Sequence, residues 1–159
     1  MSYTPMSDLG QQGLFDITRL LLQQPDLAAL SETLTRLVQQ SALADEAAII
    51  LWNAGNHRAA RYACDEAGHP VSYEDETVLA HGPVRRLLSR PDALHCDHET
   101  FADTWPQLIR SGLYRPFGYY SLLPLAADGR IFGGCEFLRR DNRPWSEKEF
   151  QRLHTFAQI

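Results

Sequence analysis

The residues best suited to bind a small ligand lie in the stretch His81-Gly82-Pro83-Val84-Arg85-Arg86. Proline directly after glycine predicts that a helix begins there. The first turn of a helix offers unpaired amides and the positive end of the helix dipole, which favour an anion. An arginine in that turn can clamp a carboxylate with two hydrogen bonds. We therefore predict that a small anion contacts Gly82, Val84 and either Arg85 or Arg86. The alternative is an ordinary helix start with both arginines in water.

A second group of candidate ligand contacts is Tyr119-Tyr120-Ser121. Side chains alternate along a strand, so Tyr119 and Ser121 should share one face while Tyr120 points to the other. A hydroxyl that faces a cavity can orient a ligand, and we therefore add Tyr119 and Ser121 to the predicted anion site. The alternative is that these are core side chains whose hydroxyls are satisfied within the protein.

The stretch His95-Cys96-Asp97-His98, with His81 as a further neighbour, contains residue types that bind zinc or another transition metal. However, no second pair at ligand spacing accompanies this cluster. We therefore interpret it as a polar turn between a strand and a helix. We predict no metal, no cofactor and no catalytic residue. The three cysteines, Cys64, Cys96 and Cys135, are odd in number and widely spaced, which favours reduced thiols.

Composition excludes several classes of function. The chain has 159 residues, enough for one domain with a real core. Its net charge of −5 argues against direct nucleic-acid contact. No apolar run approaches the ~20 residues of a membrane span, and no signal peptide is recognisable, so we expect a cytoplasmic segment. Lys148 is the only lysine among fifteen basic residues, which excludes a phosphate-binding loop with a lysine and makes a Schiff base implausible.

The clearest local structure is a hairpin, with apolar runs at Tyr119–Ala126 and Ile131–Leu138 on either side of Ala127-Asp128-Gly129. Pro124 should mark a strand end, an edge or a bulge, and glycines inside the second run indicate a bulge or a close approach to the backbone. Ser146, with Glu149 three residues later, predicts a capping box and a final helix.

Before this hairpin the pattern predicts an alternation of helices and strands. Two helices should precede residue 42, the first ending at Pro25 and the second capped by Asp26. Strands are expected at Ala47–Trp52, Arg58–Cys64 and Leu94–Cys96. Helices are expected from Pro83, with Val84, Leu87 and Leu88 facing inward, and near Glu99–Arg110. Loops are expected at Asn53–Asn56, Asp65–Pro70 and Gly112–Gly118. Glu74–Leu79 is ambiguous. This order is typical of an α+β domain with a mostly antiparallel sheet.

The C-terminal half resembles a GAF domain. The resemblance rests on Ser121, Pro124, Leu125, Gly129, Gly133, Trp145 and Ser146. It implies a sheet of about six mostly antiparallel strands, with terminal helices on one face and a ligand cavity with inserted helices on the other. On this basis residues 1–159 form a single GAF domain. Residues 1–12 are expected to be disordered, and 145–159 to begin a truncated C-terminal helix that leads into the rest of a longer protein.

The opening segment, residues 1–18, is similar to the start of a family of enterobacterial transcriptional activators, as are His81–Arg85 and Phe132–Phe137. That resemblance implies a regulatory domain with formate, or a similar small anion, as effector. It also implies further domains in the same protein: a second GAF domain, an AAA+ ATPase acting on an enhancer-dependent sigma factor, and a helix-turn-helix. We separately expect a homo-oligomer, because an exposed apolar stripe on the terminal helices should drive self-association.

Two other functions remain open. The first is an interaction module whose terminal helices dimerise or dock on a neighbouring domain through Leu14, Leu21, Leu22, Phe150 and Leu153. The second is a thiol-based enzyme, because one GAF family reduces free methionine sulfoxide. Here Gly118-Tyr119-Tyr120 lacks the cysteine of that family, and Cys135 resembles a core residue.

Overall fold

The computed structural model describes residues 27–53 and 58–157. The predictions for residues 1–12, for the first helix with its Leu14, Leu21 and Leu22, for Asp26 as a helix cap and for the turn at 54–56 lie outside the described residues. No described helix has the length and apolar character needed to cross a membrane.

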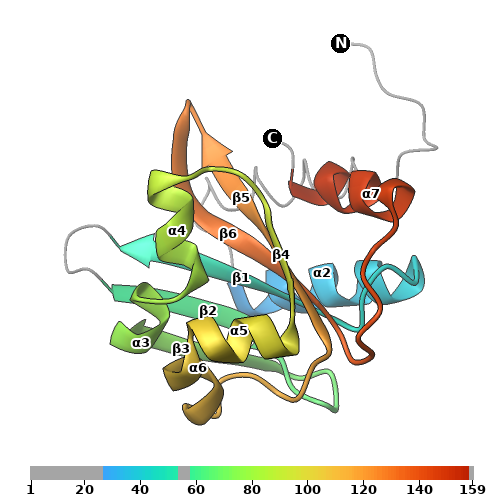
Figure 1. The fold of residues 1–159 in the computed structure, drawn as a ribbon, viewed down its shortest axis with the longest axis horizontal. Helices are drawn as coiled ribbons and strands as arrows, with labels where there is room; N and C mark the ends of the chain where they lie inside the picture. Colours follow the sequence, from blue (N-terminus) through green and yellow to red (C-terminus); the bar gives the residue numbers. More distant parts are fainter. Residues whose placement is uncertain (1–26, 54–57, 158–159) are drawn as a thin grey trace.

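The centre of the domain is a six-stranded sheet in which every neighbouring pair is antiparallel (Figure 1). The strands are β1 (Glu46–Asn53), β2 (Arg58–Cys64), β3 (Pro70–Glu76), β4 (Leu94–Asp97), β5 (Tyr119–Ala127) and β6 (Arg130–Arg139), in the spatial order β3-β2-β1-β6-β5-β4. The first and last long strands therefore meet in the middle, and β3 and β4 form the edges. The predicted antiparallel α+β sheet is confirmed.

The β5–β6 hairpin forms as the sequence predicts. Its two turn residues, Asp128 and Gly129, have positive φ values of 53° and 74°, which match the right-handed twist of the flanking strands. Further along β6, a Cβ atom at Gly133 would collide with the carbonyl oxygen of Ile50 in β1. The glycine predicted to mark a close approach therefore allows β1 and β6 to pair at the centre of the sheet.

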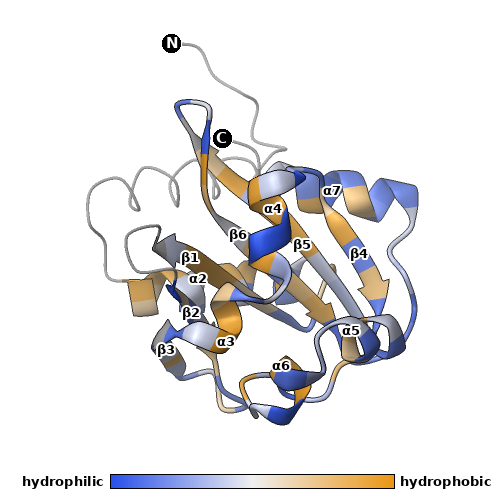
Figure 2. Ribbon diagram, turned by 60° about the vertical axis from the view of Figure 1, so that its left-hand side comes forward, coloured by the Kyte–Doolittle hydropathy of each residue, from blue (hydrophilic) through white to orange (hydrophobic). Residues whose placement is uncertain are grey.

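The helices divide between the two faces of the sheet, as Figure 1 shows. One face carries α2 (Leu27–Gln40) and α7 (Glu147–Ala157) over a core that includes Leu34, Ile49, Phe137 and Leu153. The other carries α3 (Thr77–Ala80), α4 (Pro83–Ser89), α5 (His98–Thr104) and α6 (Pro106–Arg110) over a second core. Hydrophobic residues concentrate along the central strands, whereas the tip of the β5–β6 hairpin is hydrophilic (Figure 2).

Two expectations about these elements were wrong, and one strand was not predicted. Residues 70–76 form edge strand β3, which a sequence reading misses because several of its side chains are polar and exposed. The helix expected near Glu99–Arg110 is two helices, because Pro106 lacks the amide hydrogen that would continue the first. Leu88 is 42% exposed rather than inward, since it lies on the outer side of α4.

Helix α7 begins with the predicted capping box. The backbone amide of Glu149 donates to Ser146 Oγ at 3.1 Å, and the amide of Ser146 donates to Glu149 Oε1 at 2.9 Å. Leu153, expected to contribute to an interaction surface, is instead fully buried in the core beneath this helix. That expectation is therefore wrong for Leu153, because the inward side of α7 is needed to cover the sheet.

Candidate functional site

The predicted anion-binding helix begins where the sequence places it, with Gly82 as the capping residue and Pro83 in the first turn. Gly82 and Val84 are buried, and a Cβ atom at Gly82 would lie 2.5 Å from Leu108 Cδ1. The start of α4 therefore packs against α6. Arg85 is exposed, with one nitrogen 3.2 Å from His81 Nδ1.

The six predicted contacts divide between the two faces of the sheet. Val84 belongs to the core under α3–α6. Tyr119 and Ser121 face the other way: the Tyr119 ring lies 5.7 Å from that of Trp145, and Ser121 Oγ lies 2.9 Å from His95 Nδ1. The predicted alternation is confirmed, because Tyr120 packs on the opposite face with Phe101. It also means that these residues do not surround one common space.

Arg86 and Ser121 nevertheless both act on one residue, His95 in edge strand β4. Arg86 is half-buried and donates from Nη1 to the carbonyl oxygen of Asp92 at 3.0 Å. Burial, followed by the positive charges of His154 and Arg86, lowers the pKa of His95 to about 4. His95 is therefore neutral near pH 7.

A groove of about 410 Å³ opens beside His95. It lies between the loop that leads into β4, the β5 residue Pro124 and helix α7, and it is lined by Pro91, Asp92, Ala93, His95, Pro124, Phe150 and His154. The rings of His95 and Phe150 meet edge to face, with centroids 3.8 Å apart. The groove thus combines apolar walls with imidazole groups on both sides.

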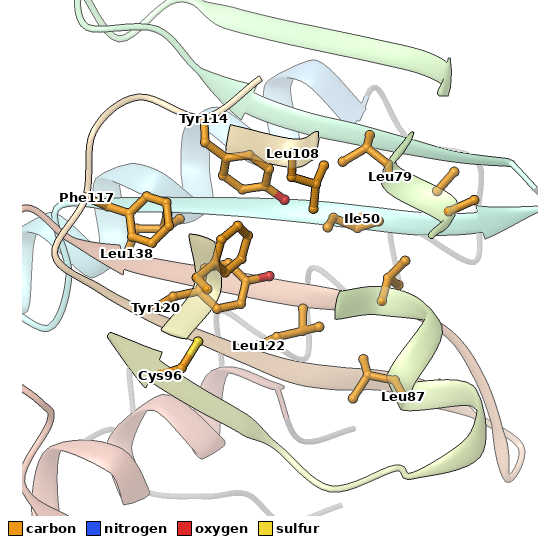
Figure 3. Packing of buried hydrophobic residues seen from close by; sticks show 14 residues of the cluster. Ile50, Leu79, Leu87, Cys96, Leu108, Tyr114, Phe117, Tyr120, Leu122 and Leu138 are labelled. Atoms are coloured by element: carbon orange, nitrogen blue, oxygen red, sulfur yellow. The ribbon is translucent and has the colours of Figure 1, made fainter. Parts of the chain in front are cut away.

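The inserted-helix face contains a second polar feature, a buried cluster around Glu136 in β6. Glu136 Oε1 accepts a hydrogen bond from Arg61 Nε at 2.6 Å, and its Oε2 accepts from the hydroxyls of Tyr114 and Tyr120, each at 2.5 Å. Arg61 Nη1 also donates to the carbonyl oxygen of Leu113 at 3.1 Å. Figure 3 shows the rings of Tyr114 and Tyr120 within this core.

The cluster is an ion pair enclosed by protein, since the Arg61 and Glu136 side chains are only 4% and 0% exposed. Burial opposes the charge on Arg61, but the Glu136 carboxylate outweighs it and raises the pKa of the guanidinium. Burial and the same carboxylate raise the pKa values of Tyr114 and Tyr120 well above 10. Both hydroxyls therefore remain protonated donors, and the chain itself supplies the carboxylate that occupies this site.

Sequence reasoning missed Arg61 and Glu136, although a signal was present. Both lie in strands that were predicted. In β2, alternation places Arg61 on the same inward face as Ala59 and Ala63. In β6, it places Glu136 on the same inward face as Gly134 and Leu138. Two opposite charges at inward positions of neighbouring strand patterns indicate a buried pair.

In the His95-Cys96-Asp97-His98 stretch, the last three residues make structural contacts: a helix cap, a buried thiol and a ring contact. Asp97 caps α5 by accepting from the amide of Thr100 at 2.8 Å, which lowers the pKa of Asp97. Cys96 is buried, and the His98 ring packs against Phe117. Across the described ranges, no three His, Cys, Asp or Glu residues are placed to hold a metal ion together.

Sequence comparison identifies a family and two close relatives. The family model described as the GAF domain matches residues 26–159. The formate hydrogenlyase transcriptional activator of Salmonella typhimurium (strain SL1344) is 74% identical over 159 residues, and the formate hydrogenlyase transcriptional activator FhlA of Escherichia coli (strain K12) is 70% identical over the same length. Each match covers 100% of this chain but 23% of the relative, so the chain spans less than a quarter of those proteins.

Structural comparison gives the same fold. The GAF domain of an Acinetobacter phosphoenolpyruvate-protein phosphotransferase is similar to this chain with a TM-score of 0.61 and 15% sequence identity, over 96% of this chain and 90% of that one. At this identity the likeness concerns the fold alone. It agrees with the architecture expected from the sequence.

Proposed function

Because this chain belongs to the GAF domain family, we propose that it is a regulatory input domain, without chemistry of its own, of an activator of formate hydrogenlyase genes. Formate is its proposed effector. The observation that carries this proposal is the 70–74% identity over the entire chain to proteins named as formate hydrogenlyase transcriptional activators. The ATPase and DNA-binding activities are proposed for other parts of the protein.

Formate demands a particular kind of site. It has one carboxylate and almost no apolar surface, so charge-assisted hydrogen bonds must supply nearly all of its affinity, each contributing roughly 1.5–3 kcal/mol. A guanidinium is the best partner because its planar fork matches a carboxylate. The proposed fork is therefore one of the two arginines in α4.

Arg86 is better placed than Arg85 for this role. It is half-buried and already oriented by the carbonyl oxygen of Asp92, whereas Arg85 is exposed and contacts His81. Arg61 is a weaker choice, because Glu136 already occupies its guanidinium and formate would have to displace a buried carboxylate. We assign the fork to Arg86.

Calorimetry or ligand-observed NMR with formate on this chain tests the proposal, with acetate and hypophosphite as comparison anions. The parent is expected to bind formate. Arg86→Ala should abolish binding with little change in thermal stability, and Arg86→Lys should weaken it because the planar fork is lost although the charge remains. Arg85→Ala is the matched control and should bind like the parent.

Two results would count against these assignments. If the parent does not bind formate, the effector acts on another part of the protein or is a different molecule. If formate binds equally well to the parent and Arg86→Ala, the fork is elsewhere in this domain.

A further inference from the structure

We propose that Arg61, Tyr114 and Tyr120 form a receptor for a small carboxylate, and that the side chain of Glu136 is its built-in occupant in the resting protein. The receptor lies on the face of the sheet that α3–α6 cover, and it is independent of the formate site assigned to Arg86. While Glu136 fills the receptor, external anions are excluded from it. When this carboxylate is removed, a free aliphatic monocarboxylate should take its place.

The first observation is the set of donors that converge on one carboxylate. Arg61 Nε lies 2.6 Å from Glu136 Oε1, and the hydroxyls of Tyr114 and Tyr120 each lie 2.5 Å from Oε2. The donors come from β2, the 113–118 loop and β5, whereas Glu136 belongs to β6. All three contacts use only the carboxylate of Glu136. Any other carboxylate in this position would therefore receive the same charge-assisted hydrogen bonds.

The second observation is that the receptor is enclosed by protein. The side chains of Arg61 and Glu136 are 4% and 0% exposed, and the Phe101 ring lies 5.6 Å from the Tyr114 ring and 4.7 Å from the Tyr120 ring. Figure 3 shows both tyrosine rings among the apolar side chains of this core. Buried donors that lose their acceptor are unfavourable in such surroundings. Removing the carboxylate alone therefore leaves one buried positive charge and two hydroxyls without their acceptor.

The third observation concerns the 113–118 loop, which covers the receptor. Arg61 Nη1 donates to the carbonyl oxygen of Leu113 at 3.1 Å, and the guanidinium carbon lies 4.1 Å from the centroid of the Tyr114 ring. The hydroxyl of Tyr114 is in turn bound by Glu136. The change that empties the receptor thus also removes one of the contacts that hold its cover in place. Transient opening of the loop then gives a small ligand a route of entry.

The size of the vacated space predicts which carboxylate fits best. Glu136→Ala removes one methylene carbon and the carboxyl group, and acetate contains the same heavy atoms. Formate lacks the carbon and leaves a gap, whereas propionate has one carbon too many. Acetate should therefore bind this variant about fourfold more tightly than formate, which is the contribution of one buried methylene group. Glu136→Gly removes one further carbon, so its preference should move to propionate.

Thermal unfolding of the whole chain in sodium acetate, formate, propionate or chloride at matched ionic strength tests the proposal. Glu136→Ala should unfold at a lower temperature than the parent in chloride. Acetate should raise the midpoint of this variant by at least about 3 °C more than that of the parent, because a ligand that binds only the folded state stabilises it. Glu136→Gln is the matched control: its amide keeps the space filled, so acetate should add nothing beyond its effect on the parent.

The inference is overturned if acetate changes the midpoints of the parent, Glu136→Ala and Glu136→Gln equally, or changes none of them. An equal response of Arg61→Met/Glu136→Ala, which lacks the guanidinium, would also contradict it. If Glu136→Ala is unfolded in chloride, recovery of its circular dichroism in acetate supports the inference. Glu136→Gly in propionate is then the second test, and no recovery in either pair overturns the inference.

These results are separate from those for the proposed function. Formate binding by the parent, and its loss in Arg86→Ala, decide whether this domain senses formate. Stabilisation of Glu136→Ala by acetate decides whether Glu136 occupies a carboxylate receptor. Either result can fail while the other stands, because the two sets of variants change different faces of the sheet.

Discussion

At the scale of single residues, the domain contains a carboxylate that is satisfied from three directions. Glu136 receives hydrogen bonds from Arg61, Tyr114 and Tyr120, which come from β2, the loop before β5 and β5 itself. A buried ion pair of this kind contributes little net stability compared with apolar residues, but losing one partner is costly because the other charge remains buried. The cluster therefore fixes how β2 and the 113–118 loop sit on the sheet.

This arrangement gives a mutational prediction. Arg61→Met should destabilise the domain by about 3–5 kcal/mol, since it leaves the Glu136 charge unpaired. The double variant Arg61→Met/Glu136→Gln should regain part of that loss, because no buried charge remains and both tyrosine hydroxyls keep an acceptor. Urea unfolding of the parent, both single variants and the double variant measures the effect. Strictly additive losses would show that the two side chains are not coupled.

A second residue-scale prediction concerns pH. The pKa of His95 is about 4 in the folded protein, below the ordinary value of 6.5, so the unfolded chain binds the proton first as the solution is acidified. The stability associated with a neutral His95 is therefore present above pH 6.5 and is lost between pH 6.5 and about 4. The difference in unfolding free energy between parent and His95→Phe should shrink over this range. A difference independent of pH would contradict the lowered pKa.

At the scale of elements, α7 depends on a local signal at its first turn. The reciprocal bonds between Ser146 and Glu149 satisfy amides that the helix itself leaves unpaired, and Glu149 also accepts from Arg139 Nη2 at 2.9 Å. The backbone amide of Ser146, followed by Arg139, lowers the pKa of Glu149. The start of the helix is therefore tied to the end of β6.

We expect Ser146→Ala to cost about 0.5–2 kcal/mol of stability, the usual effect of losing a helix cap. Thr155→Ala is the matched control in the same helix, because its hydroxyl donates to the carbonyl oxygen of Gln151 within the helix itself and alanine favours the helix. Thermal unfolding followed by circular dichroism compares the two. Equal midpoints for both variants would mean that the capping box does not stabilise α7.

The elements that the sequence predicts well are those with a short-range cause. The β5–β6 turn needs positive φ at Gly129, and the α7 cap needs Ser146 and Glu149. A stretch of a few residues is therefore enough to predict each of these two elements. Strand β3 is less visible, because pairing with β2 rather than an apolar pattern holds it in place.

The candidate site was harder to predict because long-range geometry decides it. Arg86 and Ser121 were named from local patterns, but their common neighbour His95 follows from β4 pairing beside β5, with His95 opposite Ser121. The fold was accessible through the family resemblance. The division of Tyr119, Ser121 and Val84 between two faces required the packed structure.

At the scale of the whole molecule, each of the two cores contains one thiol, Cys135 under α2 and α7 and Cys96 under α3–α6. Cys64, Cys96 and Cys135 are all free and buried. Burial, reinforced by Asp97, raises the pKa of Cys96 to about 11, and burial also raises the pKa of Cys135. Because the thiolate is the reactive form, these side chains should be inert in the folded domain.

A disulfide reagent at pH 8 tests this expectation. The native protein should react slowly, whereas the denatured protein should give a rapid titre of three thiols. The rate in the native protein should increase as urea approaches the unfolding transition, since reaction requires opening. A denatured titre of one would indicate a disulfide, and rapid native reaction would contradict the enclosed positions of Cys96 and Cys135.

The meeting of β1 and β6 at the centre of the sheet also affects the protein while it is being synthesised. Glu46 pairs with Leu138, which is synthesised roughly ninety residues later. One edge of β1 therefore stays unpaired until the ribosome has completed the β5–β6 hairpin. At a translation rate of about 5–20 residues per second, that interval is roughly 5–20 s. During this time the nascent chain presents an unpaired apolar strand, which is prone to aggregation. Slowing translation within the last third of the domain should therefore increase its dependence on chaperones.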